Sequence, residues 1–304
     1  MSDTDQIPYD EFGLFHENAA EFGLAYPGPP NVRREFVTLD DGRRISALVW
    51  GDETPQLVFL HGGAQNAHTW DTVAMALGRP MVAVDLPSHG HSDQGRNGTR
   101  DLSSTAADVA EVIRILASSA RVVVGMSYGG MTTIALAAKF PELVRAAVLV
   151  DITPGVNSEK SKAITSFVNG PESFENFDAL LARTIEYNPT RTVTSLRRGI
   201  LHNAVQRPDG SWVWRYARFR ATEDRGADPV FGNLWDAVSA IEAPLLLVRG
   251  MLPQSVVDDS DEEEFIRRAK HGSVIRVPNA GHSVQGDTPL ELAAMIADFA
   301  DRNA

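Results

Sequence analysis

The sequence of 304 residues contains no cysteine, which excludes every function that depends on a thiol. A disulfide framework, a thiol nucleophile, an iron–sulfur cluster and a thiolate zinc site all require cysteine. The absence of thiols fits a reducing compartment, and we expect a cytoplasmic protein. The sequence also lacks an apolar run of the ~18 residues that a membrane span requires. Its acidic first residues have no apolar segment of the kind found in secretory signals.

Positive charge is scarce, because 28 Lys and Arg stand against 40 Asp and Glu, for a formal net charge of −12. Without a basic surplus to neutralise phosphates, nucleic-acid binding is disfavoured. The G-x-G-x-x-G fingerprint and the P-loop are both absent, so nucleotide binding has no support. We expect a small-molecule substrate, no cofactor and no metal. The sequence predicts no particular oligomeric state.

Short continuous apolar runs are present instead, and they are typical of strands buried on both faces of a parallel sheet. Two β-rich segments at 34–39 and 45–50, joined by a turn signal, precede them and predict a hairpin. Amphipathic stretches of helical length separate the runs, which favours an α/β fold with a mostly parallel, eight-stranded sheet flanked by helices. The six apolar runs are 57–60, 81–86, 122–125, 146–150, 245–248 and 274–277.

The strand–helix alternation stops between residues 153 and 240, where helical segments take its place. A segment of this length inside an α/β core predicts a folded insertion rather than a structureless loop. We expect residues 153–240 to form a mainly helical cap, and residues 34–152 and 241–304 to form the core. Residues 1–33 are polar and interrupted by Gly and Pro, and are expected to form an N-terminal arm with a short helix.

The strongest chemical signal is GMSYGG at 125–130, which matches the pattern G-x-S-x-G around Ser127. It follows a predicted strand and opens a predicted helix, the context in which a strained turn exposes a nucleophilic serine. Glycines suit the flanking positions because such a turn leaves little room for side chains. The helix N-terminus favours developing negative charge. A glycine-rich turn with a capping serine is the alternative interpretation.

With this motif in place, the chain resembles the α/β-hydrolase family over residues 34–302. HGGA at 61–64 follows the third predicted strand, and DLPSHGHS at 85–92 follows the fourth, where the family has similar loops. His282 follows the last predicted strand, where the family carries its catalytic histidine. The resemblance implies the α/β-hydrolase fold, with the cap inserted after the sixth strand.

The resemblance also implies a serine hydrolase that cleaves a carboxylic ester or a lactone through an acyl-enzyme. Ser127 would attack the acyl carbon, and His282 would serve as its general base. Two backbone N–H groups would bind the oxyanion, those of Gly63 and Tyr128, with Ala64 as the next choice after Gly63.

The acid that orients His282 has more than one candidate. The family commonly carries it after the seventh strand, but residues 251–254 contain no carboxylate. Asp151, at the end of the sixth predicted strand, is the preferred candidate, because site residues of α/β sheets gather at the carboxyl ends of strands. Asp258 and Asp259 are the alternatives, although we expect them at the start of a helix.

The substrate pocket is the part that the sequence determines least. Trp70, Met126, Trp212 and Trp214 are candidates for an apolar lining, although such side chains are more often core. Two other functions stay open. The same serine and histidine could cleave a carbon–carbon bond of a vinylogous diketone, or the fold could serve as a non-catalytic small-molecule binding protein.

Overall fold

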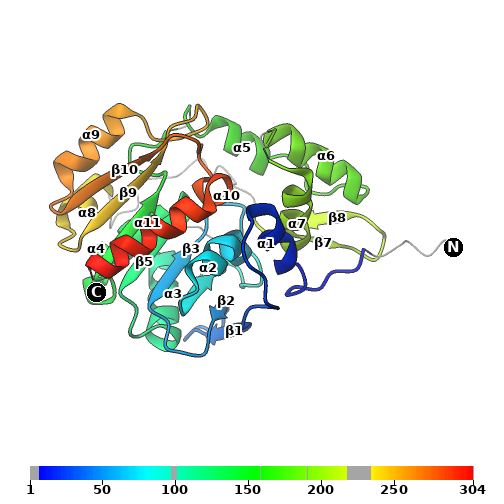
Figure 1. The fold of residues 1–304 in the computed structure, drawn as a ribbon, viewed down its shortest axis with the longest axis horizontal. Helices are drawn as coiled ribbons and strands as arrows, with labels where there is room; N and C mark the ends of the chain where they lie inside the picture. Colours follow the sequence, from blue (N-terminus) through cyan, green and yellow to red (C-terminus); the bar gives the residue numbers. More distant parts are fainter. Residues whose placement is uncertain (1–6, 97–100, 158, 190, 218–233, 304) are drawn as a thin grey trace.

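The computed structural model describes residues 7–96, 101–157, 159–189, 191–217 and 234–303. Within them one eight-stranded sheet has the order β1-β2-β4-β3-β5-β6-β9-β10 (Figure 1). Neighbouring strands from β4 to β10 are parallel, and β2 runs antiparallel to β1 and β4, so the predicted mostly parallel α/β sheet is confirmed. These strands are β1 Val32–Thr38, β2 Arg44–Trp50, β3 Leu57–Leu60, β4 Met81–Val84, β5 Val122–Met126, β6 Ala146–Val150, β9 Leu245–Gly250 and β10 Gly272–Val277.

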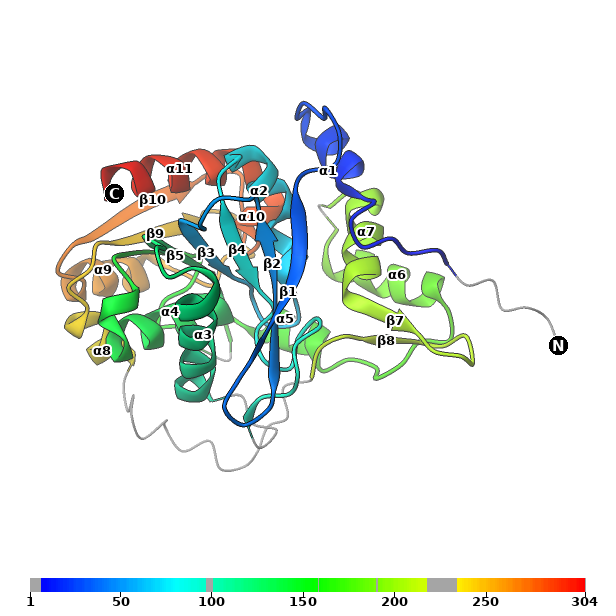
Figure 2. The same ribbon diagram turned by 90° about the horizontal axis from the view of Figure 1, so that it is seen from below.

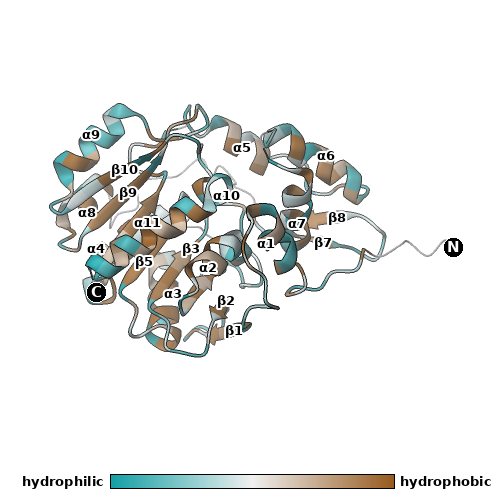
Figure 3. Cartoon of the chain, in the orientation of Figure 1, coloured by the Kyte–Doolittle hydropathy of each residue, from teal (hydrophilic) through white to brown (hydrophobic). Residues whose placement is uncertain are grey.

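Helices cover both faces of the sheet, as Figure 2 shows from below. Alternate side chains of β3 explain the arrangement: Leu57 and Phe59 enter one apolar core, and Val58 and Leu60 enter the other. Figure 3 shows the hydrophobic inner strands beside the hydrophilic outer surface of α9. One face is covered by α2 Asp71–Leu77, α10 Val284–Asp287 and α11 Pro289–Arg302, the other by α3 Leu102–Leu116, α4 Tyr128–Lys139, α8 Leu234–Ala240 and α9 Asp259–Arg268. Among the described residues, no helix is long and apolar enough to cross a membrane.

Between β6 and β9 the chain leaves the sheet and forms a separate layer, which we call the cap (elements α5 to β8). It has a small core of its own around Leu180, Ile200 and Trp212. Helix α8 differs, because Ala237 and Val238 pack in the main core. Of the residues expected to form the cap, those of α8 therefore pack with the core. The cap elements are α5 Lys162–Val168, α6 Phe177–Tyr187, α7 Val193–Asn203, β7 Ala204–Gln206 and β8 Trp212–Trp214.

The N-terminal arm lies between the core and the cap (Figures 1 and 2). Its helix α1, Phe15–Phe22, places Phe15 in the core, with its ring 5.2 Å from that of Trp50. On the cap side, Glu21 accepts hydrogen bonds from Arg198 at 2.6 Å and from Thr192 at 2.7 Å. The arm therefore fastens the cap to the sheet by apolar contacts on one side and polar contacts on the other.

Helix α4 crosses the end of β3 at very short range, and glycine makes this possible. A Cβ atom on Gly129 would collide with the carbonyl oxygen of Leu60, and one on Gly125 would collide with the Gly129 backbone. The flanking glycines of the G-x-S-x-G motif are therefore required by backbone packing, as the sequence suggested.

We predict that Gly129→Ala lowers the free energy of unfolding by about 1–3 kcal/mol, because the added methyl group overpacks the contact between α4 and β3. Gly199→Ala is the matched control, since Gly199 lies within α7 and an added Cβ would meet nothing within 4 Å. That substitution should raise the free energy of unfolding by about 0.5–1 kcal/mol. Urea unfolding measures both changes. Equal changes in the free energy of unfolding for the two variants would contradict the close packing of α4 against β3.

Candidate active site

Ser127 and Asp151 stand side by side at the carboxyl edge of the sheet. Strand β5 ends at Met126, which pairs with Val150, the last residue of β6. The next residue on each strand is Ser127 or Asp151, and the Ser127 N–H donates to the Val150 carbonyl at 3.3 Å. Both residues have positive φ, 52° and 47°, a conformation that non-glycine residues rarely adopt. Such strain is concentrated at functional sites.

Asp151 holds His282 through a buried hydrogen bond. The distance from His282 Nδ1 to Asp151 Oδ2 is 2.9 Å. The same carboxylate accepts hydrogen bonds from the Gly250 N–H at 2.9 Å, the Ser255 hydroxyl at 2.6 Å and the Val256 N–H at 3.1 Å. Four donors thus fix the orientation of a carboxylate that has no exposed surface. With Nδ1 engaged, Nε2 is the ring nitrogen of His282 that can exchange a proton with another group.

The described residues contain no hydrogen bond between the Ser127 hydroxyl and His282. Contacts of this kind are often long in unliganded enzymes and shorten when substrate binds. Ser127 also lies against the turn that follows β3. A Cβ atom on Gly62 would lie 3.3 Å from Ser127 Cβ and 2.5 Å from Met126 Sδ.

The backbone N–H groups of that turn differ in their partners. The Gly62 N–H donates to Gln65 Oε1 at 3.0 Å, and the Ala64 N–H donates to His89 Nε2 at 3.2 Å. The Gly63 N–H has no hydrogen-bond partner among the described residues. The geometry therefore favours Gly63 over Ala64 as a donor to a bound oxyanion.

Two buried polar side chains lock the loops after β3 and β4 together. His61 Nε2 accepts a hydrogen bond from the Leu86 N–H at 2.9 Å. The Asp85 carboxylate accepts one from the Ala67 N–H at 2.8 Å and pairs with Arg34 at 2.7 Å. Burial disfavours the charged carboxylate, but the Arg34 charge together with the hydrogen bonds from the Ala67 and His91 N–H groups outweighs it, so the pKa of Asp85 is lowered. These contacts give His61 and Asp85 a bracing role beside the site.

The alternative acids lie at the start of α9, away from the histidine. Asp258 caps the helix by accepting a hydrogen bond from the Asp261 N–H at 3.0 Å. Its pKa is lowered, chiefly by a hydrogen bond from the Lys160 ammonium group. Asp259 pairs with Arg249 at 2.8 Å. Neither carboxylate contacts the site histidine in the described structure, and Asp151 does.

Three of the four expected pocket residues lie in apolar cores instead. Trp70 is completely buried, and its ring lies 5.0 Å from that of Phe59. Met126 is buried beneath the turn after β3. Trp212 packs in the cap core, 5.1 Å from the ring of Phe177. Their size and apolar character, which suggested a pocket, are the same properties that drive them into the core.

Trp214 has a different position, on the side of the cap that meets the site. It stacks on Tyr216 at 5.5 Å, and its ring lies 5.7 Å from that of Phe167. Phe167, Trp214 and Tyr216, which we call the aromatic wall, pack in one cluster with Ala64 of the turn after β3. The alternation W-V-W-R-Y in the sequence puts Trp214 and Tyr216 two residues apart, a spacing that places side chains on the same side of an extended chain. The sequence carries no comparable signal for Phe167.

Comparisons with known proteins agree with this geometry. The model of the alpha/beta hydrolase family matches residues 57–295. The esterase Rv0045c of Mycobacterium tuberculosis is 42% identical over 308 aligned positions, which cover 99% of each chain. A solved structure of that esterase, reported together with its inhibition by transition metals, has a TM-score of 0.84 and covers 97% of this chain and 100% of its own. The 2-(acetamidomethylene)succinate hydrolase of Mesorhizobium japonicum is 29% identical, covering 81% of this chain and 88% of that protein.

We predict that Asp258→Ala lowers the free energy of unfolding by about 1 kcal/mol, because α9 loses its N-cap. The exposed Glu263 within the same helix provides the control, and Glu263→Ala should change the stability by less than about 0.5 kcal/mol. Urea unfolding of the two variants checks the assignment. If Asp258→Ala were no more destabilising than the control, the capping role of Asp258 would be wrong.

Proposed function

The chain belongs to the alpha/beta hydrolase family, and from this premise we propose that it hydrolyses carboxylic esters through an acyl-enzyme. The identity with an esterase, 42% over nearly the whole of both chains, supports ester hydrolysis. The observation that carries the proposal is the hydrogen bond of 2.9 Å from His282 Nδ1 to Asp151, at the sheet edge where Ser127 stands. A histidine oriented in this way by a carboxylate is the general base that a serine nucleophile requires.

In the first step the Ser127 hydroxyl attacks the ester carbonyl carbon and transfers its proton to His282 Nε2. Asp151 keeps the proton on Nδ1, orients the ring and stabilises the imidazolium ion that forms. The strained backbone at Ser127 directs the hydroxyl out of the turn between β5 and α4. His282 then returns the proton to the leaving alcohol, and a water molecule releases the acyl group by the same route.

The negative charge of each tetrahedral intermediate falls on the carbonyl oxygen. The N–H groups of Gly63 and Tyr128 are the proposed donors to it, one from each side of Ser127. Tyr128 is the first residue of α4, so the helix dipole acts in the same direction. Removing one such donor typically costs about 2.7–4 kcal/mol of transition-state stabilisation.

The aromatic wall supports a substrate with an apolar acyl or alcohol group. It packs against Ala64, which directly follows the proposed oxyanion donor Gly63. We propose that the cap selects the substrate through Phe167, Trp214 and Tyr216, while the core supplies the chemistry. A lactone satisfies the same requirements, because its alcohol is an internal leaving group.

We predict that Ser127→Ala reduces kcat for a short p-nitrophenyl ester by about a millionfold, because the nucleophile is removed. The control is Ser119→Ala, at an exposed serine after α3, which should leave kcat unchanged. The absorbance of released p-nitrophenol measures the turnover of both variants. Hydrolysis by Ser127→Ala at the wild-type rate would show that the nucleophile is wrongly assigned.

We predict that Asp151→Asn lowers kcat by about 10⁴-fold, because the amide favours the wrong imidazole tautomer while preserving the shape of the side chain. Asp258→Asn and Asp259→Asn are controls that should retain wild-type turnover. Steady-state kinetics of the three variants decide which carboxylate serves His282. A larger loss from either control than from Asp151→Asn would reverse the assignment.

A further inference from the structure

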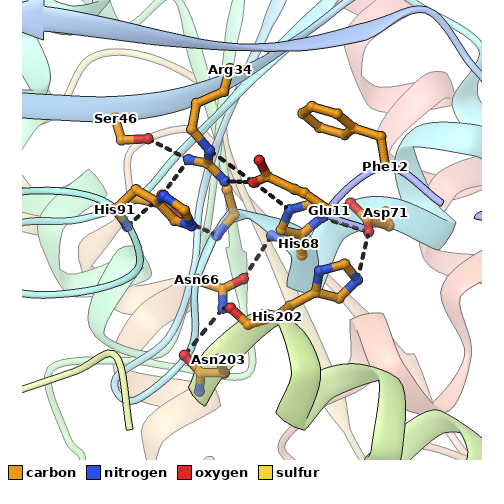
Figure 4. A network of polar contacts seen from close by, with 12 residues as sticks. Glu11, Phe12, Arg34, Ser46, Asn66, His68, Asp71, His91, His202 and Asn203 are labelled. Carbon is orange, nitrogen blue, oxygen red and sulfur yellow. Dashed lines mark hydrogen bonds and ion pairs between the residues drawn. The ribbon is translucent and has the colours of Figure 1, made fainter. Parts of the chain in front are cut away.

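A second group of buried polar side chains lies where the core meets the cap (Figure 4). His68 belongs to the short helix η1, Ala67–Trp70, Asp71 begins α2, and His202 lies near the end of α7. All three are buried, and they offer one nitrogen or oxygen atom each within 4.8 Å of one another. His68 Nδ1 lies 2.9 Å from Asp71 Oδ2, and His202 Nε2 lies 3.9 Å from the same oxygen. The two imidazole rings stack at 3.8 Å.

The N-terminal arm holds the opposite nitrogen of each ring. His68 Nε2 lies 3.1 Å from the carboxylate of Glu11, and His202 Nδ1 lies 2.8 Å from the hydroxyl of Tyr9. Each histidine therefore has one nitrogen fixed by an oxygen of the arm and the other turned toward Asp71. Metal-binding histidines show this pattern, in which the outer partner sets the tautomer and the ring orientation.

Two polar atoms in this cluster lack a hydrogen-bond partner among the described residues, His202 Nε2 and Asp71 Oδ1. Buried polar atoms are almost always paired, so two neighbouring unpaired atoms require an explanation. A cavity of about 120 Å³ adjoins them and is lined in part by His68, Asp71, His202 and Gln285. Its volume is sufficient for a water molecule as an additional ligand.

We propose that His68, Asp71 and His202 bind a divalent transition metal ion of the zinc class. Two imidazole nitrogens and one carboxylate, with one position left to water, form a common zinc ligand set. Tetrahedral zinc with such ligands places them about 3.3 Å apart. The distances of 2.9 and 3.9 Å in the cluster lie on either side of that value. Because the two rings stack within 12° of parallel, one imidazole must turn out of the stack for both nitrogens to point at the ion. Binding displaces the proton from His68 Nδ1, and that proton is released to solvent.

The proposed ligands and their hydrogen-bond partners come from different parts of the chain, so a bound ion would link these parts together. His68 and Asp71 belong to the core, His202 belongs to the cap, and Tyr9 and Glu11 belong to the arm. A bound ion would join all three and stabilise the packing of the cap against the core. This role is independent of the ester chemistry, because none of these side chains takes part in it.

The test is titration of the untagged, full-length protein with Zn²⁺ by calorimetry and with Co²⁺ by visible absorption. We expect one ion per chain and a higher Tm in Zn²⁺, because an ion that binds only the folded state stabilises it. His202→Gln should weaken binding by more than about 100-fold and abolish the Tm shift, whereas Tyr9→Phe should weaken binding on the order of tenfold. Tyr9→Phe keeps the test decisive even if His202→Gln fails to fold.

Two control variants should bind zinc as the wild type does. His271→Gln replaces an exposed histidine. His282→Gln removes the imidazole of the proposed active site, and so distinguishes the proposed metal site from the active site. The proposal would be overturned by the absence of stoichiometric binding, or by binding that neither His202→Gln nor Tyr9→Phe weakens.

Discussion

The hydrogen bond between His282 and Asp151 is the contact on which the proposed chemistry depends. It joins a loop near the end of the chain to the middle of the sheet, across 131 positions of sequence. The parallel sheet makes it possible, because β6 and β9 bring Asp151 next to the Gly250 N–H that helps to hold it. The packing of β6 against β9 that buries and holds the Asp151 carboxylate also stabilises the sheet. The proposed catalytic geometry and the stability of the fold therefore share the same interactions.

Much of the core could be predicted from the sequence, because continuous apolar runs have few alternatives to buried strands. The run at 122–125 and the one at 146–150 became β5 and β6, and their adjacency puts Ser127 beside Asp151. The choice of Asp151 over Asp258 was harder. Both are acidic residues next to a predicted element, and only the three-dimensional structure shows that Asp258 caps α9 while Asp151 meets His282.

Pocket and interface residues could not be predicted in the same way. Trp70 and Trp214 are equally apolar in sequence, yet one packs against Phe59 in the core and the other faces the turn after β3. The cluster of His68 and His202 carried no motif, because its members come from the core and the cap. Such sites depend on contacts between distant segments, whereas periodicity reports only on neighbours along the chain. The N-terminal arm is a further example, since Glu21 has no sequence feature that predicts its contact with Arg198.

The central claim, that Ser127 is a nucleophile activated by a histidine that Asp151 orients, can be tested by covalent labelling. A fluorophosphonate reacts with activated serines, and the adduct can be located by mass spectrometry of the peptides. The account predicts stoichiometric labelling at Ser127, with labelling much slower in Asp151→Asn than in wild type. Absence of labelling, or an adduct on another serine, would contradict it.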